Sequence, residues 1–423
     1  MGQRLGSSAA LRRPGAYFTD FGGVGEATAP QLDADRCLRL RSRYSDCEKC
    51  AQACPTHLLE VSNDYVDLAD GCLRCGQCSA ACPTGALQTE GFGISPSSAI
   101  SAAPLDIDCW KVPAPHSARD ALRVPCLGGI ALHELVRWHT ACAPRPIMLV
   151  DRGWCGQCSA ASRANHPAQE VLDATRELLA ELGVPEQALP RFERKRLPRK
   201  QMPAEIPDAL AARPMNRREF FTGVTRDAVR AIAPAVAGRR DERTERRRPT
   251  PAKIEVPARL QLLAQAAALG KQHRRPLPTA LFPALRVSNA CQNHNVCAAI
   301  CPTGALHSYE SEEGGVAGIA FDAGACIACG DCTRACPQHA IELLVPGAGE
   351  VPRGRTMLTQ WALRECRDCG YRFADSDSDT ICPTCQKTRD LARASFSQLF
   401  GASHGTRDDL PINSLAGSMR SID

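Results

Sequence analysis

The sequence lacks the features that mark several large classes of protein. Aromatic residues make up only 5% of the 423 residues, which is little material for a conventional hydrophobic core. No apolar run approaches the roughly 18 residues that predict a transmembrane helix. The opening stretch MGQRLGSSAALRRPGAYFTDFGG has no apolar core long enough for a secretory signal. We therefore expect a protein of the reducing cytoplasm.

Signs of a catalytic centre are also missing. The chain has no Walker loop and no dinucleotide-binding fingerprint after a strand, and no nucleophile stands beside an obvious base. Cysteine is what the chain has in excess, with 24 residues in clusters. Disulfide-rich chains are usually short and secreted, so the cysteines indicate metal binding. The length favours about three domains.

The run CLRCGQCSAACP, beginning at Cys72, reads C-x2-C-x2-C-x3-C-P without deviation. In this motif three thiolates hold one iron-sulfur cluster, and the fourth, before the proline, ligates a second cluster. The cysteine run that would hold the second cluster lies upstream, where a loop insertion widens the interval between Cys37 and Cys47. Exchange of the fourth ligands predicts two ligand sets: Cys37, Cys47, Cys50 and Cys82, and Cys54, Cys72, Cys75 and Cys78.

Zinc is the alternative for these sets, but zinc sites use two cysteine pairs and do not require a repeated Cys-Pro ending. The segment resembles the bacterial-type ferredoxin with two 4Fe-4S clusters. That resemblance implies a small pseudo-twofold α+β unit, which we place at residues 37–92 after an N-terminal extension at 1–36. We call residues 37–92 module 1.

The pattern returns in residues 286–345, which we call module 2. Exchange there predicts one complete set: Cys301, Cys326, Cys329 and Cys332. The other set holds Cys291, Cys297 and Cys336, with His294 where a cysteine is expected. Imidazole can replace thiolate on iron and raises the potential. The alternatives are a three-iron cluster with a vacant corner, or a solvated histidine beside a site that binds nothing.

Residues 104–185 form a middle domain with a different pattern. Short apolar runs that end at or near cysteine alternate with helical patterns, which predicts a parallel sheet. Functional groups collect at the carboxyl ends of such strands, so we expect one set at that edge: Cys109, Cys126, Cys155 and Cys158. Cys142 has no predicted role.

VPCLGG followed by LVDRGWCGQC makes the middle domain similar to the iron-sulfur domain in the delta subunit of methyl-viologen-reducing hydrogenase. The resemblance implies a 2Fe-2S cluster that passes electrons between partner subunits. A zinc site and a redox dithiol at Cys155 and Cys158 are the alternatives.

Residues 190–258 form a basic linker, with 18 Lys and Arg against nine Asp and Glu. Within it Phe220, Val224, Ala228 and Ile232 share one helix face. We interpret this helix as the remnant of a fused gene start, or as a docking element for an anionic membrane surface or an acidic partner.

Two CxxC knuckles at residues 360–390 are separated by twelve residues. They resemble a zinc ribbon with rubredoxin-like CGY and CPTC sequences. The expected ligands of a structural zinc ion are Cys366, Cys369, Cys382 and Cys385.

The predicted fold class is therefore α+β multidomain: two bacterial ferredoxin-like modules flanking a small α/β cysteine-rich domain, with a basic linker and a zinc ribbon. A chain built from cluster modules without a substrate site moves electrons. We expect a multi-cluster iron-sulfur protein that relays single electrons between a donor and a partner oxidoreductase. The alternatives are a catalytic subunit that uses Cys155 and Cys158 for disulfide or small-molecule reduction, and an oxygen-responsive regulator. Nucleic acid is the least favoured partner, because the linker carries mixed charge.

Overall fold

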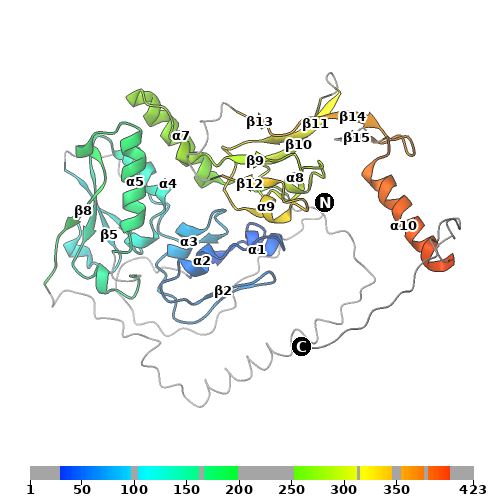
Figure 1. The fold of residues 1–423 in the computed structure, drawn as a ribbon. Coiled ribbons are helices and arrows are strands. Elements are labelled where there is room, and N and C mark those ends of the chain that lie inside the picture. Colours follow the sequence, from blue (N-terminus) through cyan, green and yellow to red (C-terminus); the bar gives the residue numbers. More distant parts are fainter. Residues whose placement is uncertain are drawn as a thin grey trace, which may run out of the picture. The chain divides into compact units, whose positions relative to one another are not determined.

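The computed structural model divides the chain into two compact units. The first runs to Tyr309 and includes Gly318–Thr359; the second consists of Glu310–Ala317 and the chain from Gln360 onward. The described residues are 29–96, 103–161, 166–198, 252–311, 315–344, 354–375 and 380–400 (Figure 1). The predicted amphipathic helix at 220–232 lies outside these ranges. Within them, no helix combines the length and apolarity needed to cross a bilayer.

Module 1 is a small α+β unit with few apolar side chains. Its elements are α1 (Leu38–Arg41), α2 (Lys49–Gln52), β2 (Leu59–Val61), β3 (Val66–Leu68), α3 (Gln77–Ala81) and β4 (Leu87–Gln88), and β1 (Gln31–Leu32) of the preceding extension joins them. The strands form two antiparallel pairs, β1 with β4 and β2 with β3, and α2 packs against α3. The buried core includes Leu59, Val66 and Leu87 together with Cys54 and Cys78, so sulfur atoms occupy much of its interior.

The middle domain contains the predicted parallel sheet, in the order β6-β5-β7-β8. The strands are β5 (Leu105–Cys109), β6 (Leu122–Val124), β7 (Ile147–Asp151) and β8 (Arg191–Arg194), all paired in parallel. Every residue of β5 is buried, as expected for a strand covered on both faces. The helices α4 (Leu132–Cys142) and α5 (Gln169–Glu181) pack against each other beside the sheet (Figure 1).

A buried ion pair braces the sheet next to Cys109. The Asp108 carboxylate is fully buried and accepts two bonds from Arg152, at 2.9 and 2.7 Å. Ser117 donates a third bond at 2.7 Å, and Arg152 also donates to the His116 carbonyl at 2.9 Å. Because every charge has a partner, the pair is tolerated; removal of one partner would leave a buried charge unpaired.

The helix α7 (Pro257–His273) begins with proline at its first position, where no backbone donor is lost. Its Leu262, Ala266 and Leu269 pack with Val136 of α4 and Leu179 of α5 in one buried cluster. The preceding residues 252–256, which we call the strap, lie between the two modules. Residues placed by sequence in the basic linker thus form β8 at one end and the strap at the other.

The strap is held by basic side chains and backbone carbonyls. Arg36 of module 1 donates to the Glu255 carbonyl at 2.7 Å, and Arg41 donates to the Ala252 carbonyl at 2.5 Å. On the other side, Lys253 donates to three carbonyls at the end of a module 2 helix, those of Ala298, Ala299 and Cys301, at 2.8–2.9 Å.

Module 2 repeats the plan of module 1. After the short helix η6 (Thr279–Leu281), its elements in the first unit are β9 (Leu285–Val287), α8 (Val296–Ile300), α9 (Asp331–Ala335) and β12 (Ile341–Leu343). The strands β9 and β12 pair antiparallel, and α8 packs on α9. Two longer strands, β10 (Leu306–Ser311) and β11 (Val316–Phe321), extend from the module, and β11 pairs with β13 (Thr356–Met357) through Ala320 and Phe321.

The second unit is a small antiparallel structure around cysteine. It contains β14 (Trp361–Glu365), β15 (Arg372–Asp375) and α10 (Pro383–Phe400). The strands pair from Ala362–Asp375 to Glu365–Arg372, and Gly370 makes the turn between them at φ 70°. The buried residues of its core are Cys366, Phe373 and Cys382.

Candidate metal centres

The four Cys-Pro sequences of modules 1 and 2 fold into the same turn. The third residue after each cysteine has a positive φ: 51° at His57, 64° at Gly85, 72° at Gly304 and 49° at His339. The turn brings backbone N–H groups back onto the cysteine sulfur. Ala86 donates to Cys82 Sγ at 3.2 Å, and Ala340 donates to Cys336 Sγ at 3.3 Å.

A second repeated turn carries the C-x2-C sequences. Positive φ angles occur at residue pairs 74 and 76 (55° and 78°), 328 and 330 (51° and 76°), and 293 and 295 (50° and 57°). In each turn an N–H group donates to the first sulfur: Arg74 to Cys72 and Ala328 to Cys326 at 3.4 Å, and Asn293 to Cys291 at 3.5 Å. Non-glycine residues adopt positive φ at an energetic cost, so the loop around His294 retains the strained backbone of the two complete loops.

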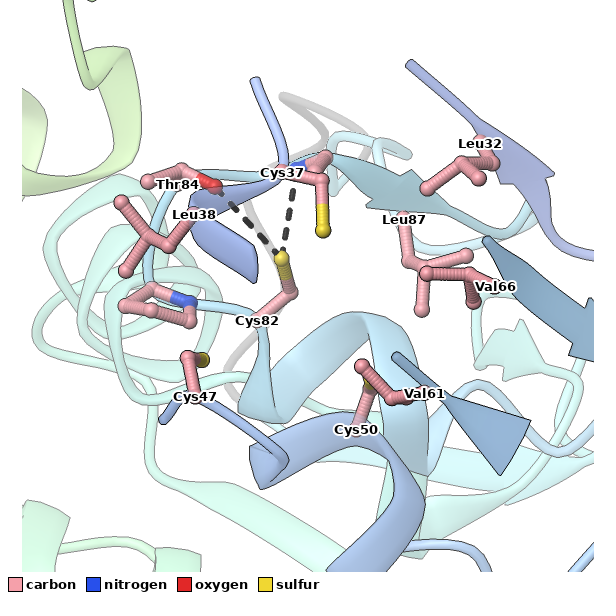
Figure 2. Close-up of a pocket in the computed structure, with 12 residues that line it drawn as sticks. Leu32, Cys37, Leu38, Cys47, Cys50, Val61, Val66, Cys82, Thr84 and Leu87 are labelled. Carbon is pink, nitrogen blue, oxygen red and sulfur yellow. Dashed lines mark hydrogen bonds between the residues drawn. The ribbon is translucent and has the colours of Figure 1, made fainter. Parts of the chain in front are cut away.

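The structure brings the predicted ligands of module 1 together in two pockets. One pocket is lined by the cysteines that we call site A: Cys37, Cys47, Cys50 and Cys82 (Figure 2). The other is lined by those that we call site B: Cys54, Cys72, Cys75 and Cys78. In Figure 2 the sulfurs of Cys37 and Cys82 point toward each other, although 45 residues separate them in the chain. Each pocket therefore combines three cysteines from one run with the fourth from the other.

Burial raises the pKa of six of these thiols in the metal-free chain, those of Cys37, Cys47, Cys50, Cys72, Cys75 and Cys78. Burial, followed by the neighbouring Cys82 and Cys37, raises the pKa of Cys50 to about 12. Burial, followed by Cys75 and Cys72, raises the pKa of Cys78 to about 12. Metal ligation requires thiolates, so a cation that displaces these protons would also remove the repulsion between the sulfurs.

Module 2 shows the same exchange. We call the complete set site C: Cys301, Cys326, Cys329 and Cys332. Burial, then Cys329, Cys326 and Cys301, raises the pKa of Cys332 to about 12. The remaining set, site D, consists of Cys291, Cys297 and Cys336, all buried. Burial, with smaller contributions from Cys291 and Cys336, raises the pKa of Cys297 to about 11.

His294 differs from the three thiols of site D because its side chain is exposed. Asn293 and Asn295, on either side of it, have buried Oδ1 atoms without a hydrogen-bond partner in the described ranges. Asn295 also occupies the left-handed position before α8 that Gly76 occupies before α3. The exposed imidazole favours the three-thiolate interpretation of site D over the histidine-ligated one.

Four of the five cysteines of the middle domain meet at the carboxyl edge of the sheet, and we call them the middle centre: Cys109, Cys126, Cys155 and Cys158. Burial, then Cys109, Cys75 and Cys158, raises the pKa of Cys126. Two sulfurs accept N–H bonds like those in the ferredoxin modules: Lys111 donates to Cys109 at 3.3 Å, and Gly128 donates to Cys126 at 3.4 Å. The Lys111 ammonium lies 3.3 Å from Cys158 Sγ.

The distances between ligand atoms distinguish sites that fit one metal ion from sites whose ligands lie farther apart. Across the described ranges, two groups of ligand atoms lie within 4.8 Å of one another: Cys366, Cys369, Cys382 and Cys385, and Asp151, Cys155 and His166. The Sγ atoms of Cys369 and Cys382 are 3.8 Å apart. Tetrahedral zinc with Zn–S bonds of ~2.3 Å places its sulfurs roughly 3.8 Å apart, and tetrahedral iron is the alternative for four thiolates. The middle centre as a set of four is wider than this.

Lys111, Asp151 and His166 were not predicted from the sequence. Asp151 closes the strand before the CxxC sequence, which was the one available signal. Nδ1 of His166 accepts a bond from the Ala168 N–H at 3.2 Å, and its Nε2 is buried without a partner in the described ranges. Cys142, at the end of α4, packs against the hydrophobic core of the middle domain.

Comparison with protein-family models gives two matches. Residues 66–88 match a 4Fe-4S binding domain, and residues 318–373 match a 4Fe-4S dicluster domain. The chain thus contains two 4Fe-4S ferredoxin-type domains. No curated protein matches the chain. The second match extends to Cys366 and Cys369, which the structure groups with Cys382 and Cys385 instead.

Proposed function

We propose that the chain is a multi-cluster electron-transfer protein that relays single electrons between a donor and a partner oxidoreductase. The observation that carries the proposal is the exchange of ligands in module 1, where each of two pockets takes three cysteines from one run and one from the other. This arrangement suits two neighbouring clusters that share short helical turns. The 4Fe-4S domain matches support the same chemistry.

The cofactors that we propose follow the ligand sets. Sites A, B and C have four thiolates each and suit 4Fe-4S clusters. Site D has three buried thiolates and suits a three-iron cluster, with the histidine-ligated 4Fe-4S cluster as the alternative. The middle centre is proposed to hold a further iron-sulfur cluster, because its spacing is too wide for one zinc ion. Zinc is proposed for the second unit.

The chain's own residues would tune these clusters. Backbone N–H groups that point at cysteine sulfur stabilise negative charge and therefore raise the reduction potential. Burial of Cys54, Cys78 and Cys297 keeps water from the sulfurs and acts in the opposite direction, because a low dielectric disfavours added charge. The balance between these two effects would set a different potential at each site.

A reductive titration tests the proposal. An anaerobic preparation should accept about four to five electrons in one-electron steps, one for each cluster. The spectra should show cluster signals at each step. A chain that accepts no electrons over the range of biological potentials would rule out the relay.

A second candidate function rests on the contact between Lys111 and Cys158. Cys158 could attack a substrate disulfide, and Cys155 would then release the second substrate thiol by forming the Cys155–Cys158 disulfide. Anaerobic alkylation distinguishes the two functions, because a free dithiol reacts at once, whereas cysteines that bind iron are protected.

The partner surfaces remain proposals. Redox partner proteins are required by any relay, and the basic linker is proposed as a peripheral contact with the inner membrane. Flotation of the linker segment with anionic liposomes at low salt would test the membrane contact, and absence of binding would remove it.

A further inference from the structure

The first unit contains two junctions through which module 1 contacts both of its neighbours. At the first junction, Gly129 of the middle domain lies against the Cys75 carbonyl, and a Cβ atom at position 129 would be only 2.1 Å from that oxygen. Gln77 also donates to the Ala160 carbonyl at 2.7 Å. Cys75 belongs to site B, so site B is the half of module 1 that faces the middle centre.

A side chain of module 1 completes this contact. Phe92 fills the remaining space between Gly76 and Gly129, so no solvent layer separates the two backbones there.

At the second junction, Arg334 of module 2 reaches module 1. Its guanidinium donates to the Tyr44 carbonyl at 2.6 Å and pairs with Asp46 at 2.9 Å. The same group holds Asp331 at 2.7 Å and the Cys329 carbonyl at 2.7 Å. Tyr44 and Asp46 precede Cys47 of site A, and Asp331 lies between two cysteines of site C, so site A is the half that faces site C.

Within each module the neighbouring sites are joined by the cysteine exchange. Cys50 of site A and Cys54 of site B stand one turn apart at α2, and Cys297 of site D and Cys301 of site C stand one turn apart at α8. Electron tunnelling falls off steeply with distance, so electrons pass preferentially between sites in contact. The contacts at the two junctions and within each module therefore allow only one order of the five centres.

We propose that the five centres form a single ordered path: middle centre, site B, site A, site C, site D. This order rests on the proposed electron-transfer function and adds to it. Module 1 is the interior of the path, and the middle centre and site D are its two ends. Donor and acceptor proteins would then meet the chain at different domains, one at the middle domain and one near His294.

Two ligand variants in module 2 test the order. Cys329→Ser removes a ligand from site C, and Cys291→Ser removes one from site D of the same module. Spin relaxation of the reduced module 1 clusters, measured by electron paramagnetic resonance on the full chain, reports their nearest paramagnetic neighbour. We expect slower relaxation in Cys329→Ser and no change in Cys291→Ser. Equal effects, or a larger effect from Cys291→Ser, would overturn the order.

A serine variant could lose the iron of both module 2 sites, which iron analysis would show. In that case a second pair of variants, which keeps every cysteine ligand, tests the order of the sites. Asp46→Lys repels Arg334 at the junction, and Glu48→Lys makes the same charge change on the other side of Cys47, where Glu48 pairs with Arg39 of module 1. We expect loss of the coupling between modules in Asp46→Lys alone. Unchanged coupling in both would overturn the junction, whereas a chain with no cluster signals at all would reject the electron-transfer function itself.

Discussion

Gly129→Ala should separate module 1 from the middle domain. The added Cβ would lie 2.1 Å from the Cys75 carbonyl oxygen and 2.4 Å from Phe92 Cζ. Phe92 cannot retreat, because Gly76 is packed against its other edge, where a Cβ would lie 2.3 Å from the ring. Ordinary contact begins near 3.4 Å, so the two backbones must move apart by about 1.3 Å. Overpacking of this kind costs about 1–3 kcal/mol.

The assay compares Gly129→Ala with Gly93→Ala, because a Cβ at Gly93 would meet nothing within 4 Å. Hydrogen exchange of the loop between Cys126 and Gly129 measures the local free energy of opening, and spin relaxation measures the distance from site B to the middle centre. We expect faster exchange and weaker coupling in Gly129→Ala only. If both variants match the unmodified chain, the close approach of the two backbones is wrong.

Three further predictions concern charge at the centres. Lys111→Met should lower the potential of the middle centre in voltammetry, because the ammonium 3.3 Å from Cys158 stabilises the reduced state. Lys111→Arg should keep the potential of the unmodified chain. Equal potentials in all three chains would show that Lys111 does not act on the centre. His294→Cys should supply the missing thiolate of site D and lower its potential; an unchanged spectrum and titration would place residue 294 away from the metal. Burial and neighbouring thiols raise the pKa values of Cys50 and Cys78 to about 12 from 9.0. These shifts stabilise the folded metal-free chain below about pH 9, and that stability is lost as the pH rises toward 12. The metal-free chain should therefore lose stability over that range in urea titrations, and the loaded chain should not; equal losses would contradict this assignment.

The ligand sets were accessible from the sequence because spacing restricts which sulfurs can meet. Three cysteines two residues apart can surround one site, and the cysteine before proline is carried by the next turn toward another. The parallel sheet of the middle domain was accessible for a similar reason, since β7 begins with four buried apolar residues and β5 alternates apolar residues with two aspartates. Both predictions depend on local patterns that the chain shows openly.

The strap and β8 could not be predicted in the same way. The strap is recognised through its backbone carbonyls, which Arg36 and Arg41 bind and which every residue type offers. Three of the four residues of β8 are charged, and the segment is a strand because β7 presents an open edge to it. In both segments tertiary contacts outweigh the composition, which alone suggested a solvated linker.

Isolated functional side chains also could not be predicted from the sequence. Lys111 approaches Cys158 across 47 residues of chain, and no sequence pattern marks such a pair. The orientation of His294 was equally inaccessible, since its position in the motif predicts a ligand while the structure leaves the side chain exposed.

The most direct test of the account is the metal content of an anaerobic preparation of the full chain. Sites A to D should contain about sixteen iron atoms, or about fifteen with a three-iron cluster at site D, and the middle centre should add about two to four. Acid-labile sulfide should be present in similar amount, and zinc should be close to one per chain. A colourless protein with zinc in place of iron and no labile sulfide would contradict the account.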